Sequence, residues 1–368
     1  MAVKMAVIAS RWADTLTAEQ RPDALSPAPR TSAAAETERI TWFYTPTDHG
    51  GLALSSQQPA QQQLAMMLLD AALTETGYNV ASTIIGLENI LDRVEGFGVR
   101  WGRERGRDPG LFYLRLFGDP HSNTPWAWRF GGHHLSVNAL IADGHVVANT
   151  PFFVGADPAA APLPGGAQLR PLGDIETLAR RFASTLDHSQ RARMQLLDRA
   201  VSDIVSGNRA HLHDGDQMMH MQDLWRGHFR DPALIKAVDD IDHRAESGSR
   251  FTPGDHELMA YTSVPKGLSS QFLTDTQKNL LRAVVCAATA CLPPLAGFDT
   301  DLDEMHIAWG GSVDGGDGPL YFRLQNTTLF YEYDNTQRDA NHAHSVLRNT
   351  HRDFGIDVLG NHYAHTAH

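Results

Sequence analysis

The sequence predicts an α+β fold in which helices pack on a mostly antiparallel sheet. Between residues 99 and 147 apolar and polar side chains alternate, which is typical of antiparallel strands. Helical spacing of apolar residues precedes these strands at 61–73 and around 81–94. Another helical stretch, 275–290, precedes a second set of alternating segments. Blocks of helices followed by blocks of strands indicate α+β architecture rather than a parallel α/β sheet.

Two segments 208 residues apart share one pattern. Trp101 and Gly102 stand fourteen positions before Arg115 and Leu116, and Trp309 and Gly310 stand fourteen positions before Arg323 and Leu324. Such self-similarity predicts an internal repeat. We expect two halves with a pseudo-two-fold relation, at about 55–155 and 265–365, joined by a helical region at about 165–250. Residues 39–368 would then form one α+β unit.

The individual elements follow from local patterns. The first 38 residues mix proline with threonine, serine and alanine without a sustained period, so we expect a loosely ordered arm there. Helices are predicted at 172–186 and 189–205, with Asp187 capping the second. Strands are predicted at 112–116, 126–130, 135–141, 307–310, 320–325, 329–333 and about 343–347.

Bulk composition excludes several classes of partner. The chain carries 43 acidic and 31 basic side chains, a net charge of −12, which argues against nucleic acid and anionic membrane surfaces. No apolar run reaches the length of a membrane span, and the stretch from Met1 to Ser10 is too short for a signal peptide. Cys286 and Cys291 are interpreted as buried core thiols. We therefore expect a cytoplasmic protein.

Histidines provide the main indication of chemistry. His342 and His344 stand two apart, so on a strand both rings share one face. His133 follows Arg115 by eighteen residues and His342 follows Arg323 by nineteen, so the repeat brings His133 and His134 into correspondence with the later pair. Adjacent residues point to opposite faces, so only one of His133 and His134 would join the site unless the backbone bulges after Gly131 and Gly132. Convergent imidazoles are typical of a transition-metal site.

Three charged residues are candidate catalytic groups. Glu332 and Asp334 stand two apart on a predicted strand, where they would complete the ligand set, orient a histidine or act as a base. The alternative is a strand with one solvent-facing side. Arg348 would either clamp a substrate carboxylate or pair structurally with Asp353 or Asp334.

The same residues resemble a known family. The relevant residues are Glu332 to Gln337, Ala340 to Val346, Arg348, Asp353 to Gly355, and His362 with Tyr363, together with Trp128, Phe130, Gly132 to Leu135, Thr150 to Phe152 and Gly155. This set, within a likeness that spans roughly residues 60–365, resembles the family called domain of unknown function 3500. The resemblance supports treating the histidine segments as one unit and implies no activity.

These observations lead to the expectation of a metal-dependent enzyme acting on a small molecule. Zinc is the expected ion, bound by His133 or His134 with His342 and His344, and its bound water would support hydrolase or lyase chemistry. The alternatives are a copper or non-haem iron oxidoreductase, or a non-catalytic binding protein with a structural histidine network. Besides the small-molecule substrate, the partner considered is a second copy in a homodimer.

Overall fold

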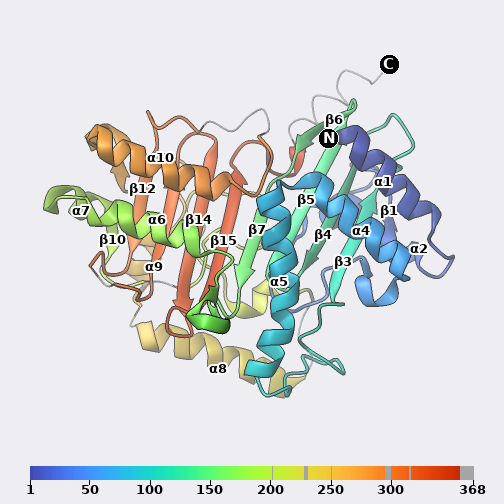
Figure 1. Ribbon diagram of the computed structural model, residues 1–368, viewed down its shortest axis with the longest axis horizontal. Helices are drawn as coiled ribbons and strands as arrows, with labels where there is room; N and C mark the ends of the chain where they lie inside the picture. Colours follow the sequence, from blue (N-terminus) through green and yellow to red (C-terminus); the bar gives the residue numbers. More distant parts are fainter. Residues whose placement is uncertain (201, 228–230, 250, 295–299, 315, 357–368) are drawn as a thin grey trace. The chain divides into compact units, whose positions relative to one another are not determined.

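The computed structural model describes residues 1–356 apart from 201, 228–230, 250, 295–299 and 315 (Figure 1). The described residues form ten α-helices and fifteen β-strands, so the fold is α+β. They divide into two compact units that are discontinuous in sequence. Unit 1 comprises Met1–Phe153, Ala290–Phe298 and Arg348–His368, and unit 2 comprises Val154–Thr289 and Asp299–Leu347.

Unit 1 is built on a meander of antiparallel strands. Leu114 of β3 pairs with Phe130 of β4, and Phe130 pairs with Val137 of β5, so apolar side chains of three strands share one face. The short strand β1 joins β3 in parallel, β2 joins it antiparallel, and β6 returns along β5. These strands are β1 (Leu25–Ser26), β2 (Leu52–Ala53), β3 (Phe112–Phe117), β4 (Trp126–Gly132), β5 (Leu135–Ala142) and β6 (His145–Ala148).

Three of the helices of unit 1 lie over one face of this sheet, namely α1 (Ala2–Asp14), α4 (Pro59–Ala72) and α5 (Glu75–Val94) (Figure 1). Unit 1 also contains α2 (Arg21–Ala24) and α3 (Ala33–Ile40). The prediction of a loose arm over residues 1–38 is wrong, because α1 to α3 occupy much of it. Trp12 of α1 is fully buried, and its indole nitrogen donates to Gln57 at 3.0 Å. Prolines between these helices act as starts and turns, as Pro22 does in the first turn of α2.

Unit 2 is also built on a meander of antiparallel strands. Its main strands are β10 (Gln195–Leu197), β11 (Leu268–Ser269), β12 (His306–Gly310), β13 (Tyr321–Gln325), β14 (Leu329–Gln337) and β15 (His342–Asn349), with a separate pair, β8 (Ala161–Pro162) and β9 (Gln168–Leu169). Strands β12, β13 and β14 form an antiparallel meander, and β15 follows β14. The division between the units falls within β7 (Phe152–Ala156) and near the end of β15.

The helices of unit 2 are α6 (Gly173–Ser184), α7 (His188–Met194), α8 (Pro232–Ser249), α9 (Pro253–Met259) and α10 (Asp275–Thr289). Asp187 caps α7 as predicted, since its side chain accepts from the backbone N–H of Gln190 at 2.9 Å. The predicted helix 189–205 is too long, because the chain leaves α7 after Met194 and enters β10. The apolar residues at 196, 197 and 204 continue the helical spacing, although they lie beyond the end of α7.

The pairing of the strands does not agree with the predicted offset of 208 residues between the two halves. That offset equates β3 with β13, but β3 pairs with β1 in parallel and β2 antiparallel, and the strand with this combination in unit 2 is β12. In the corrected comparison β4 matches β13 and β5 matches β14. Arg129 then corresponds to Arg323, since they pair with Asn138 and Glu332 respectively, each nine residues later. Arg115, by contrast, corresponds to Ala308.

Residues that make close contacts also occupy corresponding positions in the two units. Gly51 and Gly267 precede β2 and β11 with φ of 130° and 97°, and a Cβ on either would meet the backbone carbonyl oxygen of Leu114 or Ile307 at 2.8 or 2.3 Å. A side chain would be strained at both positions. Hydrogen-bonded glutamine pairs also recur, the partly buried Gln20 with Gln61 in unit 1 and the buried Gln190 with Gln277 in unit 2. The shared pattern therefore begins at α1 and α6, upstream of the repeats expected at 55 and 265.

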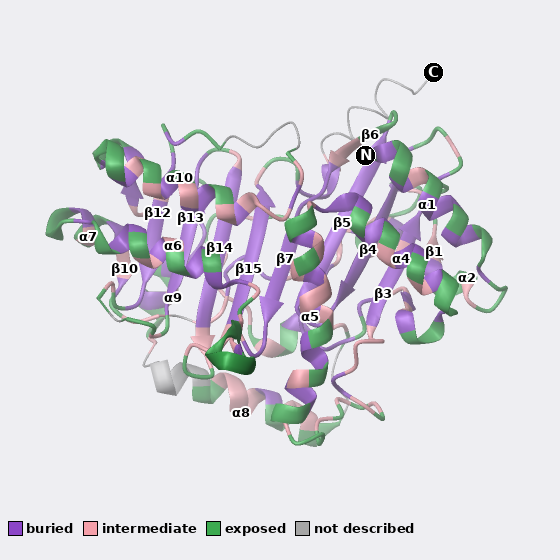
Figure 2. Cartoon of the chain, viewed as in Figure 1, coloured by how far each residue is buried: buried purple, intermediate pink, exposed green. Residues whose placement is uncertain are grey.

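Burial is concentrated in the strands, while the outward faces of the helices are exposed (Figure 2). Trp126, Trp128 and Phe130 belong to the core, as their alternation predicts. Cys291 is half-buried, and burial raises the pKa of its thiol to about 11. Cys286 is exposed, which corrects the prediction of a buried thiol, because it lies on the outward side of α10.

Among the described residues, no helix combines the length and the apolar character that crossing a membrane requires.

Candidate metal centre

Three side chains of unit 2 form a compact group of metal-ligating atoms. His344, Asp203 and Asp334 each offer one such atom, and these atoms lie within 4.8 Å of one another. Nδ1 of His344 is 2.6 Å from Oδ1 of Asp203. Asp334 and His344 are buried, and Asp203 is partly buried. A histidine with two carboxylates in a largely water-excluded position is a donor set suited to a divalent cation.

The elements that carry these residues explain why they meet. Asp334 lies on β14 and His344 on the adjacent strand β15, whereas Asp203 comes from the segment after β10. Glu332, two residues before Asp334, holds that segment in place. Its carboxylate accepts from the backbone N–H groups of Val205 and Ser206 at 2.8 and 2.9 Å. The segment is therefore hydrogen-bonded to the strand that carries Asp334.

Asp334 carries an uncompensated carboxylate oxygen. Its Oδ2 accepts no hydrogen bond from the residues that the structure describes, although the residue is only 1% exposed. Burial, and secondly the negative charge of Asp203, raises the pKa of Asp334 well above its ordinary value. A buried carboxylate in this position is unfavourable unless a proton or a cation accompanies it.

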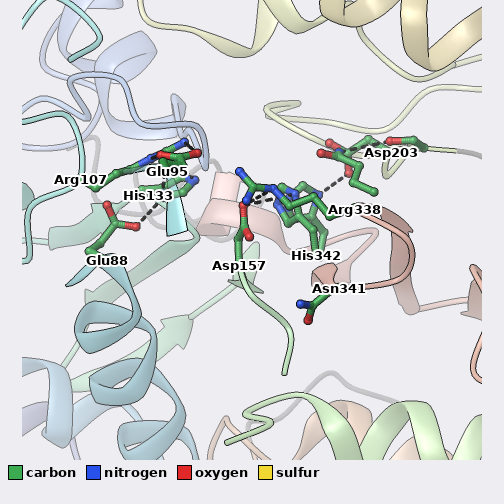
Figure 3. Close-up of polar contacts among 12 residues, drawn as sticks. Glu88, Glu95, Arg107, His133, Asp157, Asp203, Arg338, Asn341 and His342 are labelled. Carbon is green, nitrogen blue, oxygen red and sulfur yellow. Dashed lines mark hydrogen bonds and ion pairs between the residues drawn. The ribbon is translucent and has the colours of Figure 1, made fainter. Parts of the chain in front are cut away.

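His342 shows a similar association with a carboxylate. Its ring centroid lies 4.6 Å from that of His344, and its Nδ1 is 3.7 Å from Oδ2 of Asp157 (Figure 3). The prediction that β15 presents both histidines together is confirmed by this ring contact. Nε of Arg338 is 3.2 Å from the same Asp157 oxygen. At His344 the 2.6 Å contact of Nδ1 with Asp203 favours the tautomer whose lone pair is on Nε2, which is the usual arrangement of a metal-binding histidine.

The loop before β15 has an unusual backbone. Arg338, Asp339 and Ala340 have φ of 51°, 53° and 65°, which is the left-handed region that non-glycine residues rarely adopt. Asn341 anchors the loop, because its backbone and side-chain oxygens accept from the N–H groups of Ala159 and Ala160 at 2.9 and 2.8 Å. The loop thus places Arg338 and His342 on either side of one carboxylate, at a conformational cost that the surrounding contacts offset.

A cavity of about 780 Å³ adjoins the metal-ligating group. Asp203 lines it together with Arg338 and Thr336, which follow Asp334 on the chain. Apolar side chains before and within α8 form another part of the cavity lining, at Met219, Met221, Leu224 and Ile241. Its volume is in the range of small-molecule sites, and its lining combines an apolar part with a polar part.

In unit 1, His133 and His134 form the two-residue turn between β4 and β5. Their directions are therefore set by the turn and not by a strand face or by the bulge considered as an alternative; His134 adopts φ of 63° and its ring stacks on that of His133 at 3.7 Å. Gly132 is required because a Cβ there would meet the ring of Phe112 at 2.4 Å. The turn, rather than alternation along a strand, decides where the two rings point.

His133 is held by charged groups of unit 1 (Figure 3). Its Nδ1 is 2.5 Å from Oε1 of Glu88, and Arg107 Nη1 lies 3.3 and 3.4 Å from its two ring nitrogens. Arg107 in turn pairs with Glu95 at 2.8 Å. Because a guanidinium beside the ring opposes a second cation, His134 is the better ligand candidate of the two. The two pairs of histidines belong to different units, so a shared ion stays a prediction.

The remaining predicted site residues have structural partners. The Glu332 carboxylate accepts four hydrogen bonds, the two already described and two from the hydroxyls of Ser206 and Tyr321 at 2.5 and 2.6 Å. The expected solvent-facing side of β14 does not exist, because residues 329–335 are all buried. Arg348 pairs with Asp353 at 2.6 Å, which confirms the structural pairing proposed for it. His362 lies outside the described residues.

Two carboxylates at the site were not among the predicted residues. Asp157 follows β7 and Asp203 follows β10, far from the histidines in sequence. Each contacts a histidine only because strands distant in the chain become neighbours. The local signal applied to Asp157 alone, which directly follows the buried strand β7, a placement that is common for aspartate at strand ends.

Comparison with known proteins gives one match. A family model described as "Protein of unknown function (DUF3500)" matches residues 1–356. No curated protein and no solved structure matches the chain.

Proposed function

Because the chain belongs to the DUF3500 family, whose description names no activity, we propose a function from the geometry of unit 2: a divalent-metal-dependent enzyme that acts on a small molecule. The observation that carries the proposal is the unsatisfied oxygen of Asp334 beside His344 and Asp203. A cation bound there would compensate a buried charge that the surrounding residues leave unbalanced.

In this proposal His344 and Asp334 are ligands, and the neighbouring ring of His342 supplies a further nitrogen. Asp203 orients the imidazole of His344 through Nδ1, as carboxylates near bound metals commonly do, and the charge of Asp157 lies 3.7 Å from Nδ1 of His342. His133 or His134 is the further ligand expected from the sequence, and the guanidinium of Arg107 beside His133 favours His134. Two or three histidines with a carboxylate match catalytic zinc sites, so zinc is the first choice.

The chemistry proposed is hydrolysis or elimination on a substrate in the cavity of unit 2. When bound, zinc lowers the pKa of a coordinated water to near neutrality and polarises a carbonyl oxygen. Asp203 lines the cavity and also contacts His344, so it connects the substrate space with the ligand group. Thr336 and Arg338 offer hydrogen-bond donors to an oxygen-bearing substrate, and the apolar part of the lining would bind its carbon skeleton.

The second candidate is a non-haem iron oxidoreductase. The specific observation in its favour is that His344 is grouped with the carboxylates of Asp203 and Asp334 while its ring contacts that of His342, since two histidines with one carboxylate are the ligand set of many iron oxygenases. Copper is a further alternative because imidazole also suits it. A coloured, oxygen-consuming protein would favour these oxidoreductases over the zinc enzyme.

The decisive experiment measures metal content. Protein expressed without an affinity tag is purified with and without added zinc, iron or copper, and bound metal is determined by elemental mass spectrometry. We expect about one equivalent in the wild type. We expect loss of that metal in His344→Ala and Asp334→Asn, while the folding transition and circular dichroism are retained.

Matched controls come from the same unit. His306 at the start of β12 and Asp314, whose side chain is 78% exposed, lie outside the ligand group. His306→Ala and Asp314→Asn should keep the wild-type metal content. If the wild type binds no stoichiometric metal and Asp334→Asn is at least as stable as the wild type, then a proton takes the place of the cation and the protein is a non-catalytic binder.

A further inference from the structure

Glu332 was a candidate catalytic residue, but its surroundings give it another task. It is fully buried in the middle of β14, and all four of its hydrogen bonds have donors within unit 2. Three of those four donors are on Val205 and Ser206, and the fourth is the hydroxyl of Tyr321. A carboxylate saturated in this way is not available to a substrate, since each lone-pair direction is already used.

The donors on Val205 and Ser206 belong to the segment that delivers Asp203. Asp203 stands two residues before Val205, and its Oδ1 also accepts from the backbone N–H of Ile204 at 2.6 Å. The same Oδ1 lies 2.6 Å from Nδ1 of His344. A chain of contacts therefore runs from the Glu332 carboxylate through the backbone of 204–206 to the imidazole of His344.

We propose that Glu332 is a positioning residue, which sets the place of Asp203 and thereby the orientation and tautomer of the His344 ring. Hydrogen bonds from backbone N–H groups to a buried carboxylate are strong and directional, so they fix the segment more firmly than contacts between neutral groups. Asp203 is partly exposed and lines the cavity, so this anchoring also keeps it from turning toward solvent. The proposal rests on the metal site proposed above.

The test separates anchoring from general stability by a graded set of variants. Glu332→Gln replaces an acceptor oxygen with an NH₂ group facing backbone donors, so the segment is displaced. Ser206→Ala removes one hydrogen bond from the segment and leaves its two N–H contacts. Tyr321→Phe removes a hydrogen bond to the same carboxylate without touching the segment, and it is the matched control.

Two measurements are made on each variant. The first is zinc affinity by competition with a chromogenic chelator, and the second is the NMR resonance of the imidazole Nδ1–H proton of His344 in metal-free protein, identified by its loss in His344→Ala. For Glu332→Gln we expect zinc affinity to fall about 10–100-fold, the range seen when partners of metal ligands are removed. The resonance should move upfield or exchange too fast to observe. Ser206→Ala should show a smaller change of the same kind, and Tyr321→Phe should match the wild type in both.

The proposal is overturned if Glu332→Gln, or Ser206→Ala where the former does not fold, keeps both wild-type zinc affinity and the wild-type resonance. It is also overturned if Tyr321→Phe changes both as much as Glu332→Gln does. The resonance is recorded without metal, so it tests the positioning role even if the wild type binds no zinc. Absence of zinc with an intact, variant-sensitive resonance would refute the metal site alone.

Discussion

Strands β5 and β14 have corresponding neighbours in the two units but carry different side chains at two corresponding positions. Asn138 pairs with Arg129, and Glu332 pairs with Arg323. Asn138 donates to the carbonyl of Pro151 at 2.7 Å, whereas Glu332 accepts from the segment after β10. One strand thus holds its neighbouring segment with a neutral donor, and the other holds it with a buried charge.

The second difference lies two residues further along. Leu140 packs in an apolar cluster with Phe117, Ala127 and Ala148, while the corresponding residue in unit 2 is Asp334. The same scaffold therefore has a closed apolar position in unit 1 and a carboxylate that needs a partner in unit 2. Function on a shared architecture depends on such local substitutions and not on the architecture itself.

The largest effect is expected when the aspartate of unit 2 is placed at the corresponding position of unit 1. Leu140→Asp would bury a carboxylate in the apolar cluster of Phe117, Ala127 and Ala148. We expect it to lower the free energy of unfolding by about 3–5 kcal/mol, because an uncompensated buried charge costs that much. Urea unfolding followed by tryptophan fluorescence measures the change. A loss of unfolding free energy below about 1 kcal/mol would show that water reaches the side chain at this position.

The reverse substitution, Asp334→Leu, should have its effect on binding rather than on folding. Metal affinity should fall at least about 100-fold, which corresponds to about 2.7 kcal/mol. The midpoint of thermal unfolding of the metal-free protein should not fall, since a buried charge is replaced by an apolar group. Isothermal titration and calorimetry provide the two readings. A metal affinity equal to that of the wild type would place the ion elsewhere.

Gly51 and Gly267 allow the two units to be compared at the turns that lead into β2 and β11. Gly267→Ala should cost about 1–3 kcal/mol, the range for a side chain in a disfavoured backbone conformation. Gly51→Ala should cost less, because its nearest backbone contact is 2.8 Å rather than 2.3 Å. Chemical denaturation of both variants checks the order. If Gly51→Ala lowers the free energy of unfolding more than Gly267→Ala does, then the contact distances do not determine the cost of a side chain at these two turns.

The smallest effect is expected for the glutamine pairs. Gln61 donates to the carbonyl of Thr15 and to Gln20, and Gln277 donates to the carbonyl of Thr185 and to Gln190. Gln61→Ala and Gln277→Ala should each cost about 1–2 kcal/mol, since each removes hydrogen bonds worth about 1 kcal/mol apiece. Thermal unfolding should give shifts of equal size. Clearly unequal shifts would argue against equivalent roles in the two units.

Much of the fold was predictable because alternation and helical spacing are local signals. The meander strands, the helices α4 and α10 and the cap at Asp187 are confirmed. The helix α2 was missed because Pro22 in its first turn resembles a proline of a loop, and α1 and α3 were included in the same predicted arm. The repeat offset was wrong by one strand because β3 and β13 each carry an arginine, Arg115 and Arg323, although the strands that pair with them differ.

The site was predictable only in part, for a physical reason. His344 and Asp334 were identified because spacing along a strand reveals which side chains share a face. Asp203 and Asp157 were missed because they approach from segments whose positions depend on strand pairing across long sequence separations. Glu332 was assigned to chemistry because its sequence position cannot show that its oxygens are already occupied by backbone donors.

The division of unit 1 has a consequence for synthesis and for truncation. Arg39 donates to the carbonyl of Phe354 at 2.7 Å, so a side chain made early depends on a partner translated more than three hundred residues later. Unit 2 behaves in this respect as an insertion within unit 1. During translation the first strands therefore lack their contacts with the C-terminal residues until the last part of the chain leaves the ribosome. A shortened protein ending before residue 348 should therefore be captured by chaperones or degraded.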